Sequence, residues 1–319
     1  MTVRQRQFAR PLGVLVVLAL LAAGVLAWRL MVDSDPSGAA AAPPPDTTRS
    51  TAPGTKEPQP KPGRPDRTSE PRTPAARAVY LGDSLAMENQ EVLAGLLEKS
   101  GSANLRSAPH SGTTLCDYLE GDRERSLVPP EHKAAALVRE ERPKVVVLQF
   151  WGNSWGYTPC MGKVGSGTPA YYERYAADAR ALTGQIERAA HDAGIPRPRI
   201  VWVLQGPDAM APDRIRQVNQ IYEAQAKAAS DLTADAGARV TRAGDRYRYV
   251  QRLPCTAYEQ AHPAYCTGQG STDLHRDDDY LHFCLAPTTT TPKPCRTRSP
   301  GILRYSQAIA SAVEKYLKK

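Results

Sequence analysis

The chain has 319 residues and a formal net charge of +8, and 41% of its residues are hydrophobic, which is close to the value for globular proteins. Residues 1–77 hold 11 Lys/Arg against 6 Asp/Glu, so most of the excess positive charge lies in this N-terminal part. Basic stretches interleaved with aromatic residues do not occur in the sequence, which excludes nucleic acid as the expected partner.

The segment 1–33 predicts a cytoplasmic N-terminus and a membrane anchor. Residues 12–28 carry no charge, arginines precede them and aspartates follow them. By the positive-inside rule, the N-terminus stays in the cytoplasm and the body of the chain is exported. The apolar segment approaches the ~20 residues that a spanning helix needs, so we expect a single-pass protein of the cell membrane. Val25-Leu26-Ala27 also suits cleavage by a signal peptidase, and in that alternative the protein is secreted.

Residues 34–77 predict a disordered linker, because they are rich in Pro, Ala and Thr and contain almost no large apolar side chain. Residues 78–319 then form the folded domain, which holds all six cysteines. An even number of cysteines in an exported domain suggests three disulfides. Nearest-neighbour loops favour Cys255–Cys266 and Cys284–Cys295, which leaves Cys116–Cys160. Zinc binding is the alternative, but neither CxxC nor HxxxH spacing is present, so we expect no metal.

From residue 78 onwards, short apolar runs alternate with helical patterns, which is typical of a parallel sheet covered by helices on both faces. The expected strands are 78–81, 104–108, 144–150, 199–205 and 238–243. The expected helices are 85–99, 131–141, 171–193, 215–232 and 301–317. Residues 244–300 are expected to be irregular.

The first expected strand runs directly into Gly82-Asp83-Ser84. Gly82 allows a sharp bend, and Asp83 and Ser84 are residue types that favour a helix start. Ser84 is therefore predicted at the carboxyl edge of the sheet, where ligands bind in open α/β folds. A serine hydroxyl at that place can attack a carbonyl while nearby amides stabilise the oxyanion. The alternative is that Ser84 only caps the helix.

Three further features follow later strands or precede the last helix. Gly112 lies in the loop after the second strand, and Gly152-Asn153 comes directly after the third. Asp279 and His282 form an Asp-x-x-His pair ahead of the final helix. With Ser84, these blocks resemble the SGNH, or GDSL-type, hydrolase superfamily over about residues 78–317. The resemblance departs from the usual pattern at Ser154, where simple members have aspartate after the asparagine.

The resemblance implies a flavodoxin-like three-layer α/β/α sandwich with a five-stranded parallel sheet. It also implies that Ser84, His282 and Asp279 form a catalytic triad, with no cofactor. The oxyanion hole would consist of the amides of Ser84 and Gly112 with the side chain of Asn153. His282 would take the serine proton, and Asp279 would hold the second ring nitrogen. Asp277 and Asp278 are rival acids, but only Asp279 has the spacing of the superfamily.

Other side chains near these blocks are candidates for substrate binding. Aromatic residues suit stacking on sugar faces, although ordinary packing under a long loop explains them equally well; these candidates are Trp151, Trp155, Tyr157 and, beside Gly112, His110. The remaining histidines without a matching context are expected at the surface, namely His191, His262 and His275. A bridge between Cys116 and Cys160 would brace the Gly112 and Asn153 loops.

The expected function is therefore that of an extracytoplasmic serine esterase or O-acyltransferase, bound to the membrane by its anchor. The expected substrate is an acylated, in particular acetylated, carbohydrate of the cell envelope or another ester. A lipase-like or thioesterase-like activity is the enzymatic alternative. From another functional class, the chain could be an inactive surface-binding module that retains only the fold.

Overall fold

The computed structural model describes residues 75–121, 125–154, 158–286, 294–295 and 297–319. All of them belong to one compact unit, Ser69–Lys319. The predicted anchor at 1–33 and nearly all of the predicted linker at 34–77 lie outside the described residues, so both remain predictions. In the part of the chain that is described, no helix has the length and apolar character needed to cross a membrane.

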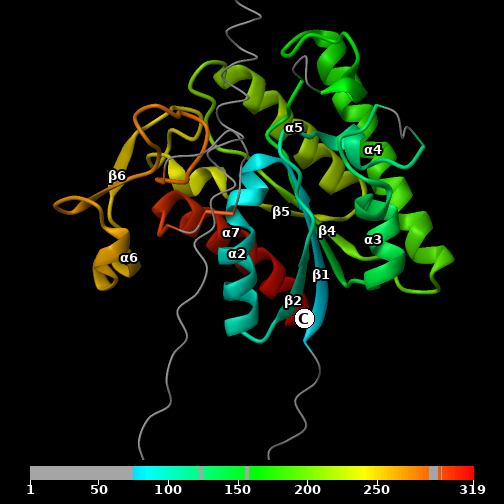
Figure 1. Cartoon of the computed structure of the whole chain (residues 1–319), viewed down its shortest axis with the longest axis horizontal. Helices are drawn as coiled ribbons and strands as arrows, with labels where there is room; N and C mark the ends of the chain where they lie inside the picture. Colours follow the sequence, from blue (N-terminus) through cyan, green and yellow to red (C-terminus); the bar gives the residue numbers. More distant parts are fainter. Residues whose placement is uncertain (1–74, 122–124, 155–157, 287–293, 296) are drawn as a thin grey trace, which may run out of the picture. The chain divides into compact units, whose positions relative to one another are not determined.

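A five-stranded sheet with all neighbouring strands parallel forms the centre of the domain, as predicted (Figure 1). Its strand order is β2-β1-β3-β4-β5. The central strand β3 is buried along its whole length, which explains its continuous run of apolar residues. The strands are β1 (Ala76–Gly82), β2 (Ala103–Ser107), β3 (Val145–Gln149), β4 (Arg199–Val203) and β5 (Leu232–Ala234).

Helices cover both faces of this sheet and complete the three-layer sandwich (Figure 1). Alternate residues of each strand point to opposite faces, so two apolar clusters form, one on each side. On one side the strands pack mainly against α3, α4 and α5, and on the other against α2 and α7. The helices are α2 (Ser84–Lys99), α3 (Ala134–Glu141), α4 (Pro169–Asp192), α5 (Pro212–Ala228), α6 (Ala257–Ala261) and α7 (Pro300–Leu317).

The fifth strand lies earlier than the sequence indicated. The predicted strand 238–243 is wrong, because α5 ends at Ala228 and β5 follows at once. Ser230 has a positive φ of 54°, which ends the helix and turns the chain back to the sheet. The 3₁₀ helix η4 (Gly237–Val240) occupies the first half of the predicted segment. Gly237 crosses the end of β4 so closely that an added Cβ would lie 2.2 Å from the Gln205 carbonyl oxygen.

Residues 244–300 are more ordered than the sequence indicated. Two short antiparallel strands, β6 (Arg252–Pro254) and β7 (Ser271–Asp273), form a separate sheet with α6 between them in the chain. Each strand has only three residues, too few to show a period in the sequence. A buried ion pair, with Arg304 Nη2 2.7 Å from Glu259 Oε2, joins α6 to α7.

All three expected disulfides are present, joining Cys116 to Cys160, Cys255 to Cys266 and Cys284 to Cys295. The first joins the 3₁₀ helices η1 (Leu115–Tyr118) and η3 (Pro159–Met161). These short helices follow the loops that carry Gly112 and Asn153. The bridge therefore connects the segments that follow β2 and β3.

Replacing Cys116 and Cys160 together with alanine is expected to lower ester-hydrolysing activity before it lowers the helical signal. The unfolded chain gains freedom without the bridge, which typically costs about 2–4 kcal/mol of stability. The two loops also lose their common brace, and a displacement of about 1 Å can cost roughly 10²-fold in rate. Activity and circular dichroism, followed together during heating, measure both effects.

The matched control for this experiment replaces Cys255 and Cys266, whose bridge lies in the β6–β7 segment. It should lose stability but keep a larger part of its activity at low temperature. Equal loss of activity in the two double variants would contradict a specific role for Cys116–Cys160.

Candidate active site

Ser84 is the first residue of α2 and follows the end of β1 by two positions. Asp83 is the N-cap, and its Oδ1 accepts a hydrogen bond from the Leu85 amide at 3.1 Å. Gly82 leaves no room for a side chain, since a Cβ would lie 2.2 Å from the Gln149 carbonyl oxygen. This close contact between the ends of the neighbouring strands β1 and β3 fixes the bend that presents Ser84 at the sheet edge. Ser84 begins the helix with its backbone, and its side chain contacts His282.

His282 bridges Ser84 and Asp279. Its Nε2 lies 2.9 Å from Ser84 Oγ, and its Nδ1 lies 2.9 Å from Asp279 Oδ2. The other oxygen of Asp279 accepts hydrogen bonds from the amides of Leu281 and His282, each at 3.0 Å. The carboxylate therefore holds both the ring and the backbone of the histidine. This arrangement has the geometry of a Ser-His-Asp triad.

The charges at the site favour an ionised aspartate and a basic histidine. Burial raises the pKa of Asp279, but the hydrogen bonds from His282 outweigh it and bring the pKa well below its usual range. Burial lowers the pKa of His282, but the hydrogen bond to Asp279 and the charges of Glu88 and Asp279 outweigh it. The net pKa of His282 is raised, so the ring is a good proton acceptor near neutral pH.

Asn153 ties together the loops that follow β1, β2 and β3. Its Nδ2 donates to the Thr113 carbonyl at 3.0 Å and lies 3.5 Å from Asp83 Oδ2. Thr113 in turn donates its hydroxyl to the carbonyl of His110 at 2.6 Å. Gly112, the preceding residue, has a φ of 75°. Because β2 and β3 flank β1, Gly112 and Asn153 lie on the two loops beside Ser84.

Asp83 contributes more than a helix cap. Its Oδ2 accepts the Trp151 amide at 2.6 Å, so the carboxylate joins the start of α2 to the loop after β3. The side chain is fully buried, and burial raises its pKa to about 6, although the amides of Trp151 and Leu85 oppose the rise. Ser154 stands where the superfamily usually has aspartate, and its hydroxyl donates to the Val164 carbonyl at 2.8 Å.

Gly152 holds the backbone next to Asn153 in a position that no other residue fits well. Its φ is 89°, and its carbonyl accepts hydrogen bonds from Tyr171 Oη and Arg214 Nη1, each at 2.7 Å. An added Cβ would lie 2.6 Å from Tyr171 Oη and 3.1 Å from Arg214 Nη1. Tyr171 and Arg214 therefore support the loop that carries Asn153.

Replacing Gly152 with alanine is expected to reduce kcat/KM for an aryl ester by about 10²-fold, because the displaced loop moves Asn153. The matched control is Gly95→Ala in α2, where nothing lies within 4 Å of an added Cβ. That control should keep full activity and gain about 0.5–1 kcal/mol in stability. Unchanged kinetics in a folded Gly152 variant would show that the loop tolerates the change.

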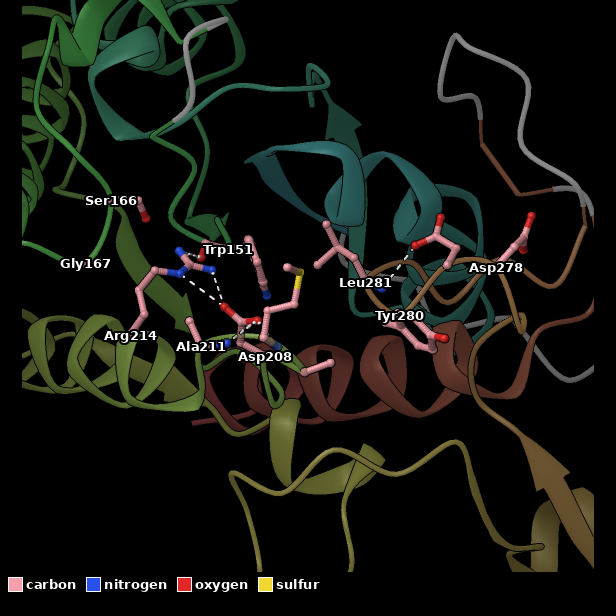
Figure 2. A pocket seen from close by; sticks show the side chains of 12 residues that line it. Trp151, Ser166, Gly167, Asp208, Ala211, Arg214, Asp278, Tyr280 and Leu281 are labelled. Carbon is pink, nitrogen blue, oxygen red and sulfur yellow. Dashed lines mark hydrogen bonds and ion pairs between the residues drawn. The ribbon is translucent and has the colours of Figure 1, made fainter.

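A cavity of about 560 Å³ adjoins the triad (Figure 2). Asp279 belongs to its wall, and the side chains around it come from the loops after β3 and β4 and from the segment ahead of His282. Figure 2 shows Arg214 and Asp208 paired on one side of it and Leu281 and Tyr280 on the other. Much of the lining is apolar, as with Trp151, Ala209, Met210, Ala211 and Leu281.

The remaining substrate-binding candidates have different surroundings. Trp151 lines the cavity but is only 8% exposed, and the Arg214 guanidinium lies 3.8 Å from its ring centroid, so it is also packed. Trp155 and Tyr157 lie outside the described residues. His110 is paired with His132, with Nε2 2.9 Å from Nδ1.

Several polar residues at the site were not identified from the sequence. Glu88 is buried one turn after Ser84, and Arg214 is buried against Gly152. The expectation of a surface position is wrong for His275, which is 4% exposed and lies with its Nδ1 3.0 Å from the His282 carbonyl oxygen. Burial lowers the pKa of His275 to about 4, so the neutral ring donates this hydrogen bond.

The described residues include one cluster with the spacing of metal ligands, which is Cys116, Asp117 and Cys160. The two sulfurs are bonded to each other, so this cluster offers no thiolate. Asp117 instead accepts hydrogen bonds from the amides of Thr114 and Leu127, both at 2.9 Å. The cluster is therefore suited to bracing the loop rather than to holding an ion.

No family model and no curated protein matches the chain. Among solved structures, a psychrotrophic esterase from Pseudoalteromonas is 12% identical, with 76% of this chain and 100% of that chain covered and a TM-score of 0.42. A lipase/acylhydrolase from Enterococcus faecalis is 13% identical, with 76% and 96% covered and a TM-score of 0.41. An acetyl-xylooligosaccharide esterase from Geobacillus is 12% identical, with 75% and 94% covered and a TM-score of 0.42.

The topology of the chain itself defines its fold. Parallel strands in the order β2-β1-β3-β4-β5 bring the serine, glycine and asparagine blocks to one edge, and the Asp-x-x-His pair reaches the serine from the far end of the chain. This sheet, covered by helices on both faces, is the three-layer α/β/α sandwich that the resemblance to the SGNH/GDSL hydrolases predicts.

Proposed function

We propose that the chain is a serine esterase that cleaves acyl esters through Ser84, His282 and Asp279. The observation that carries the proposal is the continuous contact from Ser84 Oγ to His282 Nε2 and from His282 Nδ1 to Asp279, each step 2.9 Å long. A serine that only began the helix would not require a partly buried Asp–His pair on its hydroxyl. The N-terminus of α2 also favours a developing negative charge, because the helix dipole is positive at that end.

In the proposed reaction, Ser84 Oγ attacks the ester carbonyl while His282 Nε2 takes its proton. The oxyanion is stabilised by the amides of Ser84 and Gly112 and by the Asn153 side chain. When the tetrahedral intermediate collapses, the C–O bond to the alcohol breaks and His282 returns the proton to the leaving oxygen. Water, activated by His282, then attacks the acyl-serine and releases the acid. A second alcohol in place of water would make the same site an O-acyltransferase.

The proposed substrate is an acyl ester, in particular an acetyl ester, of a cell-envelope carbohydrate. Tyr280 lines the same cavity as Trp151 and is 56% exposed, which suits contact with a sugar face. Asp278, whose side chain is 76% exposed, brings a carboxylate that can accept hydrogen bonds from hydroxyls. A longer acyl chain, as in a lipase or thioesterase, is the second candidate, favoured by the apolar walls from Met210 and Leu281.

The three disulfides indicate an oxidising compartment. They support the proposal that the domain works outside the cytoplasm, attached by the predicted anchor at 1–33. The linker at 34–77 would then separate the domain from the membrane surface.

The test is a comparison of acetyl, longer-acyl and acetylated-glycan esters with the purified protein, together with labelling by a fluorophosphonate probe. Covalent labelling at Ser84 and turnover of at least one ester are expected. Preference for the acetylated glycan favours the carbohydrate esterase, and preference for long acyl chains favours the second candidate. A folded protein that neither reacts with the probe nor turns over any ester would instead be an inactive binding module.

A further inference from the structure

Glu88 is a buried acid on the same face of α2 as Ser84. The two residues are four positions apart, which places them one above the other on the helix. Glu88 is 2% exposed, and its Oε2 accepts a hydrogen bond from the Phe283 amide at 3.0 Å. Phe283 directly follows His282. Two consecutive turns of α2 therefore contact the histidine segment, one through the ring of His282 and one through the next peptide.

The backbone around His282 is held from three directions. Asp279 accepts its amide, His275 lies against its carbonyl oxygen, and Glu88 accepts the amide of the following residue. Of these three side chains, only that of Glu88 comes from the helix that also carries Ser84. The hydrogen bond between Glu88 and the Phe283 amide therefore couples the position of the His282 segment to α2, the helix that begins at Ser84.

The surroundings of Glu88 also connect its charge to that of His282. The charged and titratable groups that interact with it are His282, Asp279 and Arg276. On the remaining side, α7 packs along α2, and its Tyr305 ring stands 4.9 Å from that of Phe283. Burial raises the pKa of Glu88 to about 7, and the positive charge of His282 opposes this rise. Each of the two groups shifts the pKa of the other, so their titrations are coupled.

We propose that Glu88 is a positioning residue for His282, whose carboxylate holds the histidine segment against α2 and, when ionised, stabilises the imidazolium. The chemical part of this inference rests on the proposed esterase function. During attack by Ser84, His282 becomes positively charged. Asp279 and Glu88 would both stabilise this positive charge. On protonation, Glu88 loses its negative charge and with it this contribution.

The sign of the pH effect follows from the charge. The esterase needs neutral His282, so activity is lost as the pH falls through the pKa of this histidine. An ionised Glu88 favours the imidazolium and so raises the pKa of His282. The loss of activity therefore occurs at a higher pH. Removing the charge is therefore expected to move the acid limb of kcat/KM to lower pH.

The experiment compares Glu88→Gln, Glu88→Ala and the control Glu91→Gln, an exposed position on the same helix. Glutamine keeps an acceptor for the Phe283 amide but not the charge, so its acid limb should move to lower pH while kcat on the plateau changes less than in the alanine variant. Alanine removes the acceptor and should lower kcat by about 10²-fold. Glu91→Gln should leave the pH profile and kcat unchanged.

A second readout needs no substrate. The ring of His282 is titrated by NMR in the wild type and in Glu88→Gln, with the signal assigned by His282→Gln. A lower pKa of His282 in Glu88→Gln is expected even if no ester is turned over, which separates this inference from the proposed function. An unchanged titration of His282 would overturn the electrostatic role, and wild-type kcat in a folded Glu88→Ala would overturn the positioning role.

Discussion

Replacing Ser84 with alanine is expected to lower kcat for an aryl ester by about 10⁴–10⁶-fold, because it removes the hydroxyl that contacts His282 Nε2 and would attack the carbonyl. The fold should remain, since Asp83 still caps α2 and the bend at Gly82 is unchanged. Single-turnover hydrolysis and fluorophosphonate labelling measure the loss of the nucleophile, and thermal unfolding measures the fold.

The matched control for this change is Ser311→Ala, at an exposed position of α7. Alanine is well tolerated in helices, so this variant should keep its activity and its melting temperature. Turnover within tenfold of the wild type by a folded Ser84→Ala variant would remove Ser84 from the role of nucleophile.

Replacing Asp279 with asparagine is expected to cost about 10⁴-fold in kcat. The asparagine oxygen can still accept the amides of Leu281 and His282, so the loop should keep its shape. The ring, however, loses the carboxylate that accepts its Nδ1 proton, and the neutral amide favours the wrong tautomer. The pKa of His282 should fall as well, because the hydrogen bond that its ring donates to the carboxylate is one of the causes that raise it.

A pH–rate profile with the control Asp277→Asn measures this effect. Asp277 is an exposed neighbour in the same acidic run, and its variant should resemble the wild type. The acid limb of Asp279→Asn should lie at lower pH than that of the control. If the two variants lost activity equally, overall negative charge in the segment would explain the loss, and Asp279 would have no individual role.

The central part of the fold could be predicted from short-range patterns. The strand β3 is a run of apolar residues buried on both faces, and α7 repeats apolar residues at helical spacing. The position of β5 could not be predicted in this way. It has only three residues, of which only Ala234 is buried, whereas the predicted segment 238–243 is diverted by the close approach of Gly237 to the end of β4. That approach depends on contacts with a distant strand.

The candidate site was predictable where residue type and spacing carry the chemistry. The predicted contacts of His282 with Ser84 and with Asp279 are present. Asn153 lies on the neighbouring loop. Glu88 was not predictable, because an acid in an amphipathic helix is expected at the surface. Its burial arises only when the histidine segment, far away in the sequence, covers α2.

The contact between Ser84 and His282 joins positions 198 residues apart. A ribosome working at about 5–20 residues per second would make the serine about 10–40 s before the histidine. Throughout that interval the nascent chain carries a serine without its base, and α2 lacks the α7 helix that packs along it. With the proposed triad, the polypeptide would therefore be inert towards esters while it is being synthesised, and its reactivity would begin only when the C-terminal part has been made and docked.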